Sequence, residues 1–233
     1  MTSLEIKKTL FHALERNDLE TIVSLAQKNK RALSQLVRFA YDKDTLVGWR
    51  AIKAIGRVSE VLVKTDNEYL RVTIRKLLWS LTDESGGIGW SAPEILGEIV
   101  RADPEKFSDI IPLIAGVYEI EENVFRPGVM YALANIAETA PERVACYQKI
   151  IIMALVDTAP LVRIYALMLI EKIWHISVEN NLWSKEYIHR ILKIIHSLKK
   201  DAGVGIIYIN NSYSDIQVGE IAQKVINNTI IAE

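Results

Sequence analysis

The sequence predicts an all-α protein in which pairs of helices stack side by side. An apolar segment recurs along the chain, centred on alanines separated by 41, 40, 34 and 56 residues, namely Ala51, Ala92, Ala132, Ala166 and Ala222. Apolar residues within and between these segments repeat with helical spacing. Prolines stand at the expected first turns, where the missing N–H is no loss. Periods of this length with helical filling are typical of stacked helix pairs.

The first quarter of the chain predicts three helices ahead of the first well-formed repeat segment. Apolar spacing places them at about 4–15, 19–27 and 31–41, and Asn17 or Asp18 can cap the second. Residues 1–29 are therefore expected to form N-terminal cap helices. A turn at 42–44 leads into the segment 45–56, which contains Gly-Trp-x-Ala and closes with a glycine.

The sharpest copy of the repeat is the stretch 84–99. Its glycines at 86, 87 and 89 allow a tight backbone path and predict a connection. Ser91 can cap the helix that follows, and Glu94 would lie near the positive end of the helix dipole. The stretch lacks the lysine and the preceding strand of a phosphate-binding loop. In the alternative interpretation, Trp90 is a core anchor and the glycines are ordinary loop residues.

The rest of the chain follows the same scheme. Intervening helices are expected at about 67–81, 104–118, 141–156 and 184–199, and further repeat segments begin at Gly128, Val162 and Val218. The long last interval contains 200–214, in which 206–209 favours a β conformation. We expect an extended loop that covers the last repeat, and a strand pairing with a second molecule is the alternative. Residues 1–233 are predicted to be one domain that ends in a loop and a cap helix, 200–233.

The segment 162–166, Val-Arg-Ile-Tyr-Ala, and the segment 49–56, Trp-Arg-Ala-Ile-Lys-Ala-Ile-Gly, resemble the second helix of HEAT repeats. The resemblance includes the HEAT-like group first noted in phycobilisome lyases, and it covers roughly residues 30 to 230. It implies a right-handed α-α superhelix, HEAT- or armadillo-like, of about five to six helix pairs. The tryptophans and the glycine loop depart from the usual repeat and suggest an uncharacterised prokaryotic subfamily. Such repeats serve many tasks, so the resemblance implies no activity.

Composition excludes several classes of function. Half of the residues are apolar and the net charge is −1, which argues against broad binding to nucleic acid or to an anionic membrane. Cys146 is the only cysteine, so neither a disulfide within the chain nor a cysteine metal cluster can form. Its apolar surroundings predict a buried, inert thiol. We see no signal peptide, and the densest apolar run, 150–156, is too short to span a bilayer. A cytoplasmic protein without membrane contact is expected.

No constellation of side chains predicts catalysis, a metal or a cofactor. None of the four histidines is followed by glutamate, so the His-Glu pairs of the iron-binding HEAT-repeat hydroxylase are absent. His189 and His196 are expected on a solvated helix face. No serine lies in a G-x-S-x-G elbow. We therefore expect no catalytic residue, no metal ligand and no cofactor.

The second helices of such a stack line a concave surface that commonly binds partners. Tryptophan, tyrosine and arginine dominate binding hot spots. The candidate binding residues, all near the starts of these helices, are Trp49, Arg50, Gly87, Trp90, Glu94, Arg126, Tyr131, Arg163 and Tyr165. In the alternative interpretation, the aromatic residues only fill space between helix pairs, and Arg126 and Arg163 pair with acids such as Glu94 or Glu122.

The preferred hypothesis is a non-enzymatic scaffold that binds a protein or peptide on the concave face. A second hypothesis is a DNA-binding enzyme, because Trp49, Trp90 and Glu94 invite comparison with HEAT-like alkylpurine glycosylases. The absence of excess positive charge and the order of the motifs count against it. A third is a small anionic ligand at the 86–90 loop with Arg126 as the anion contact. Another protein or a peptide is the expected partner, and nucleic acid is not.

Overall fold

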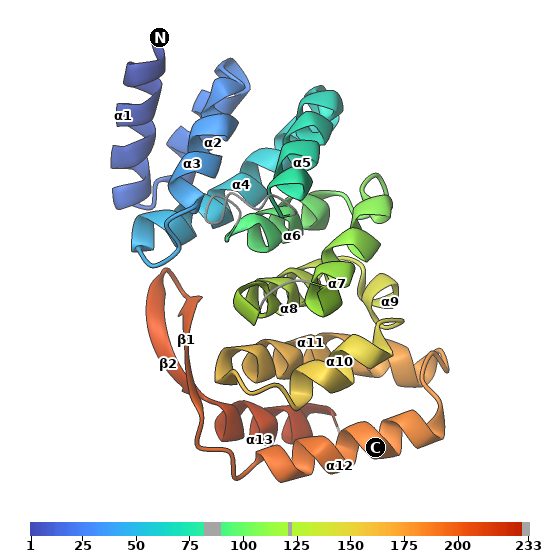
Figure 1. The fold of residues 1–233 in the computed structure, drawn as a ribbon. Helices are drawn as coiled ribbons and strands as arrows, with labels where there is room; N and C mark the ends of the chain where they lie inside the picture. Colours follow the sequence, from blue (N-terminus) through green and yellow to red (C-terminus); the bar gives the residue numbers. More distant parts are fainter. Residues whose placement is uncertain (82–89, 121–122, 230–233) are drawn as a thin grey trace.

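A computed structural model of the chain describes all residues except 82–89, 121–122 and 230–233. The predicted fold class is confirmed. The described residues form thirteen α-helices, two short 3-10 helices and one two-stranded sheet, and the helices stack in pairs along a curved solenoid (Figure 1). Six pairs can be followed from the N-terminus to the C-terminus, in agreement with the expected five to six.

Each pair contributes one helix to an inner layer and one to an outer layer. Neighbouring inner helices pack against one another along the stack; they are α2 (Leu19–Lys28), α4 (Leu46–Thr65), α6 (Ala92–Ala102), α8 (Arg126–Ile136), α11 (Pro160–Glu179) and α13 (Val218–Thr229). The outer helices are α1 (Ser3–Glu15), α3 (Arg31–Ala40), α5 (Asn67–Leu81), α7 (Ile111–Ile120), α10 (Gln148–Leu155) and α12 (Lys185–Leu198). Three short elements join them, η1 (Ser108–Ile110), η2 (Asn123–Phe125) and α9 (Pro141–Val144).

The repeated small residues let the inner helices approach closely. All five of the aligned alanines are fully buried. A Cβ atom added to Gly97 of α6 would lie 2.6 Å from the Cα of Ala132 on α8, which leaves no room for a side chain. The tandem segments therefore lie side by side, as predicted, and they bury one continuous apolar core.

Side-chain caps form at the starts of two inner helices and are absent at a third. The Thr45 side chain accepts a hydrogen bond from the Gly48 amide and caps α4, and Asp18 caps α2 through the Thr21 amide. Ser91 occupies the N-cap of α6, but its hydroxyl makes no cap bond and instead donates to the carbonyl of Tyr41. The prediction of a side-chain cap at Ser91 was therefore wrong.

Two outer helices differ from the predicted ranges. The expected helix at 104–118 begins only with η1 and α7, because the Asp103 carboxylate accepts a hydrogen bond from the Lys106 amide and holds a turn there. The expected helix at 141–156 is divided into α9 and α10. Cys146 lies exposed in the turn between them, so the prediction of a buried thiol was wrong. Desolvation nevertheless raises the pKa of this thiol above its ordinary value, which keeps it protonated at neutral pH.

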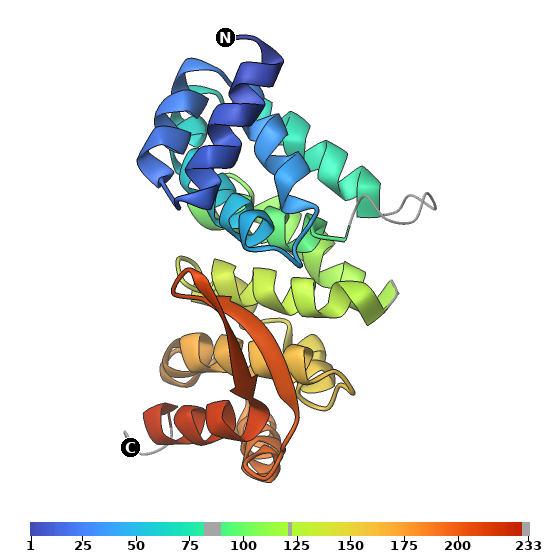
Figure 2. The same cartoon turned by 90° about the vertical axis from the view of Figure 1, so that its left-hand side faces the viewer.

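The segment before α13 is a β-hairpin and not an extended loop. Strand β1 (Val204–Ile209) pairs with β2 (Ser212–Gln217) in antiparallel register. The turn residues Asn210 and Asn211 have φ angles of 51° and 65°, the backbone that matches the twist of a two-residue hairpin turn. Because β2 is the partner of β1, the strand does not depend on a second molecule. The hairpin crosses the inner layer over α11 and α8 and ends near α4 (Figure 2).

Candidate functional site

A row of aromatic rings crosses the inner layer beneath the hairpin. Trp49 on α4 lies edge-on to Tyr131 on α8, with ring centroids 5.2 Å apart, and Tyr131 meets Tyr165 on α11 at 5.5 Å. Tyr208 of β1 stacks on Trp49 at 5.8 Å, with the two ring planes only 5° apart. The rings are buried, so they join three of the helical repeats and the hairpin into one surface.

The hairpin lies between two cavities on this concave surface. Successive residues of a strand point to opposite sides, and accordingly Ile206 lines one cavity and Ile207 lines the other. The first cavity, of about 680 Å³, will be called the acidic cavity. The second, of about 470 Å³, will be called the basic cavity. Tyr165 lines both.

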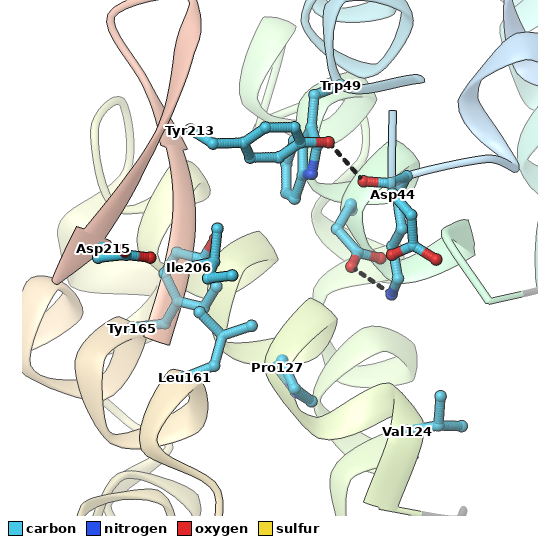
Figure 3. Close-up of a pocket in the computed structure, with 11 residues that line it drawn as sticks. Asp44, Trp49, Val124, Pro127, Leu161, Tyr165, Ile206, Tyr213 and Asp215 are labelled. Atoms are coloured by element: carbon cyan, nitrogen blue, oxygen red, sulfur yellow. Dashed lines mark hydrogen bonds and ion pairs between the residues drawn. The ribbon is translucent and has the colours of Figure 1, made fainter. Parts of the chain in front are cut away.

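The acidic cavity combines carboxylates with aromatic and aliphatic walls (Figure 3). It is lined by Lys43, Asp44, Trp49, Glu94, Val124, Pro127, Leu161, Tyr165, Ile206, Tyr213 and Asp215. Three carboxylates face one ammonium group, so the lining carries a formal charge of −2. The Tyr213 hydroxyl donates a 3.1 Å hydrogen bond to the carbonyl of Lys43, which ties β2 to the turn ahead of α4.

Glu94 is the buried acid of this cavity, with only 2% of its surface exposed. Its Oε1 accepts a 3.0 Å hydrogen bond from Lys43, whose ammonium also donates to the Trp90 carbonyl at 2.9 Å. Its Oε2 is buried without a hydrogen-bond partner. A Cβ atom at Gly128 would lie 2.5 Å from this oxygen, so glycine at the first turn of α8 makes room for the carboxylate. The positive end of the α8 dipole lies at this position and stabilises the charge.

A second buried acid, Glu98, lies one turn further along α6 and is fully paired. It accepts hydrogen bonds from Tyr131 at 2.6 Å and from Lys53 at 2.7 Å, and Arg101 lies 3.3 Å from its other oxygen. Gly56 on α4 leaves the space that this carboxylate occupies. Burial together with the Glu98 charge raises the pKa of Tyr131 well above its ordinary value. Glu98 therefore holds α4, α6 and α8 together.

The basic cavity lies beyond this network. Its polar lining includes Lys53, Arg57, Arg101 and Lys172 with a single acid, Glu138. Each of these cations already has a carboxylate partner, so the cavity wall is close to neutral overall.

The structure brings four of the predicted site residues to the two cavities. Trp49, Glu94 and Tyr165 line the acidic cavity, and Tyr131 and Tyr165 line the basic cavity. Trp90 is 50% exposed, which excludes the alternative in which it is a core anchor, and it does not line either cavity. Gly87 lies outside the described residues.

None of the three predicted arginines lines either cavity. Arg50 donates to the carbonyls of Leu14 and Glu15 at the end of α1. Arg126 pairs with Asp157 at 3.2 Å, and Arg163 pairs with Asp201 at 2.8 Å. Pairing with acids was one of the two sequence interpretations; Glu94 pairs with Lys43 instead, and Glu122 lies outside the described residues.

Several lining residues were missed from the sequence, chiefly Lys43, Asp44, Tyr213 and Asp215. Nothing in the sequence marks the two aspartates as cavity residues, because exposed acids are common in turns and strands. The hairpin had a signal, because Asn-Asn lies between two β-prone runs and asparagine tolerates positive φ.

Other kinds of site find little support in the part of the chain that the structure describes. No group of three or more histidine, cysteine, aspartate or glutamate side chains is placed to hold a metal ion among those residues. All four histidines are exposed, and for His189 and His196 this agrees with the expected solvated helix face. No described helix combines the length and hydropathy that crossing a membrane would require.

The stacked pairs and the lined inner face define the class of the protein as an α-solenoid of the armadillo and HEAT type. An engineered protein is similar over 99% of this chain and 98% of its own, with a TM-score of 0.56 and 16% identity. A designed armadillo repeat protein is similar over 98% of this chain and 94% of its own, with a TM-score of 0.55 and 16% identity. At such identities the likeness shows the fold alone.

Sequence comparison adds one relative. An uncharacterized protein of Archaeoglobus fulgidus is 33% identical over 105 residues, which is 45% of this chain and 54% of the relative. The match thus spans about half of the relative's length. No family model matches the chain.

Proposed function

We propose that the protein is a binding module that holds an extended segment of another protein on its concave face, alongside the hairpin. The observation that carries the proposal is the pair of cavities on either side of β1, open on one face and lined by residues from several repeats. Ile206 is 61% exposed on this surface, and exposed apolar side chains beside a cavity are typical of partner sites. The solenoid fold supports a scaffold role.

Charge favours a protein segment over nucleic acid. The acidic cavity carries a formal charge of −2, which repels a phosphodiester backbone. Arg126, the anion contact of the third hypothesis, is engaged by Asp157, and Asp157 also accepts a hydrogen bond from Tyr118. These contacts do not favour a small anionic ligand at that arginine.

The test is a peptide-display selection against the full chain, followed by affinity measurements with the selected peptides. Ile206→Trp would fill the acidic cavity with a larger side chain from an exposed position. Val204→Trp is the matched control, because Val204 is also exposed on β1, at 54%, but does not line either cavity. We expect selected peptides to lose binding to the first variant and to keep binding to the second.

Equal binding to both variants, or failure to select any peptide that binds the folded chain reproducibly, would overturn the proposal. Far-UV circular dichroism of both variants checks that the helical stack is intact. Both substitutions are at exposed strand positions, so neither should unfold the solenoid.

A further inference from the structure

We propose that the acidic cavity binds an organic cation, namely the ammonium or guanidinium group of a lysine or arginine side chain in the bound segment. The inference rests on the proposed function and adds the chemistry of the ligand. Lysine and arginine side chains both carry a positively charged group on a short apolar stem. A free amine could supply the same chemistry.

The first argument is unbalanced charge at the rim of the cavity. Asp44, ahead of α4, and Asp215, on β2, lie on opposite sides of the opening (Figure 3). Neither side chain makes a hydrogen bond or an ion pair with the described residues, whereas most acids facing the concave surface are paired. Two unpaired carboxylates at one opening add to its negative potential, and that potential favours a cation there.

The second argument is unused hydrogen-bonding capacity inside the cavity. Tyr165 is only 5% exposed, yet its hydroxyl makes no hydrogen bond to any residue that the structure describes. The Oε2 of Glu94 also lacks a partner, but it has no accessible surface and lies against Gly128, so it acts on a bound cation only through its charge. The hydroxyl oxygen of Tyr165 is not fully enclosed and lies on a cavity wall, so it is free to accept a hydrogen bond from a ligand's donor. The Glu94 charge, which contributes to the raised pKa of Tyr165, shows that the hydroxyl and this carboxylate share one electrostatic environment.

The third argument is the shape and lining of the cavity. Lys43 already places an alkylammonium group against Glu94 and the Trp90 carbonyl, so this wall accepts that chemistry. The rings of Trp49 and Tyr213 and the side chains of Leu161 and Ile206 supply apolar walls for a methylene stem. The carboxylates do not converge as a metal site would among the described residues, which suits a larger cation.

The experiment uses two acetylated and amidated pentapeptides, Gly-Gly-Arg-Gly-Gly and the same peptide with citrulline, the neutral isostere of arginine. Binding to the full chain is measured by titration calorimetry at low and high salt. The test variant is Asp44→Asn with Asp215→Asn. The charge-matched control is Glu186→Gln with Glu220→Gln, two exposed acids that do not line the cavity.

We expect the arginine peptide to bind at least about tenfold more tightly than the citrulline peptide, with the preference falling in high salt. The Asp44→Asn, Asp215→Asn variant should lose most of that preference, and the control should keep it. Equal affinity for the two peptides, or an unchanged preference in the test variant, would overturn the inference.

Two further measurements distinguish a free amine from a bound segment as the source of the cation, and distinguish failure of the cation inference from failure of the proposed function. If agmatine or spermidine binds as tightly as the arginine peptide, the cation belongs to a free amine and the assignment to a bound segment is overturned. If display selects peptides that depend on Ile206 but show no enrichment in arginine or lysine, the segment-binding function stands and the cation inference falls.

Discussion

The hydroxyl of Tyr131 on α8 donates a 2.6 Å hydrogen bond to the carboxylate of Glu98 on α6, and Glu98 is completely buried. A carboxylate at this depth is tolerated only if its oxygens are paired. Lys53 and Arg101 provide the remaining partners from α4 and α6. The network connects three consecutive repeats through one charge.

Removing that hydroxyl should weaken the stack. We expect Tyr131→Phe to lower the free energy of unfolding by about 1.5–3 kcal/mol, the range for a lost hydrogen bond to a charged group. Urea denaturation measures the change. Tyr165→Phe is the control, because the Tyr165 hydroxyl has no partner among the described residues, and it should shift stability by less than about 0.5 kcal/mol. Equal losses in both variants would contradict this account of Glu98.

Two helical glycines should respond to alanine with opposite signs. Gly97→Ala places a Cβ against the backbone of Ala132 and should destabilise the protein by about 1–3 kcal/mol through overpacking. Gly116 lies within α7, and an added Cβ there meets nothing within 4 Å. Gly116→Ala should therefore stabilise the helix by up to about 1 kcal/mol. Thermal unfolding of the two variants checks the prediction, and a destabilising effect of the same size at both sites would refute it.

The hairpin should depend on the backbone of its turn. Asn211→Val puts a β-branched residue at a φ of 65°, a conformation that costs on the order of 1–3 kcal/mol. We expect the protection against hydrogen exchange of the Ile207 and Ile209 amides, which lie at hydrogen-bonded positions of the β1–β2 pair, to fall about tenfold or more, while the core helices stay protected. Asn211→Gly should retain protection, because glycine adopts positive φ without strain. Unchanged exchange in the valine variant would contradict the predicted dependence.

Alkaline pH should destabilise the folded chain through its buried tyrosines. Burial raises the pKa of Tyr165 above its ordinary value of 10.0 and raises the pKa of Tyr147 to about 12. Since the folded state holds these protons more tightly than the unfolded chain, their contribution is complete below pH 10 and is lost as pH rises through the raised values.

Urea midpoints at pH 8 and pH 11 measure this loss. Tyr165→Phe removes one titrating group, so its midpoint should fall less between the two pH values than that of the unaltered chain. A larger fall in the variant would show that the sign is wrong.

Much of the solenoid could be predicted from the sequence, and part of the candidate site. Apolar spacing around Ala51, Ala92, Ala132 and Ala166 reports which face each helix buries, because that face is set by local periodicity. The same reasoning placed Trp49, Glu94 and Tyr165 on the inner layer. It did not predict where the arginine side chains lie. An arginine near a helix start is long enough to reach either a neighbouring carboxylate or the concave groove, and local spacing does not distinguish the two.

By itself the sequence determined an all-α stack of paired helices and the face that each helix buries, because repeat spacing and helix signals act over a few neighbouring residues. Only the tertiary structure decided where the hairpin lies. Tyr213 and Lys43 are 170 residues apart in the chain, yet they share a hydrogen bond. The acidic cavity exists because that long-range contact brings Asp215 opposite Asp44, and no local pattern encodes such a meeting.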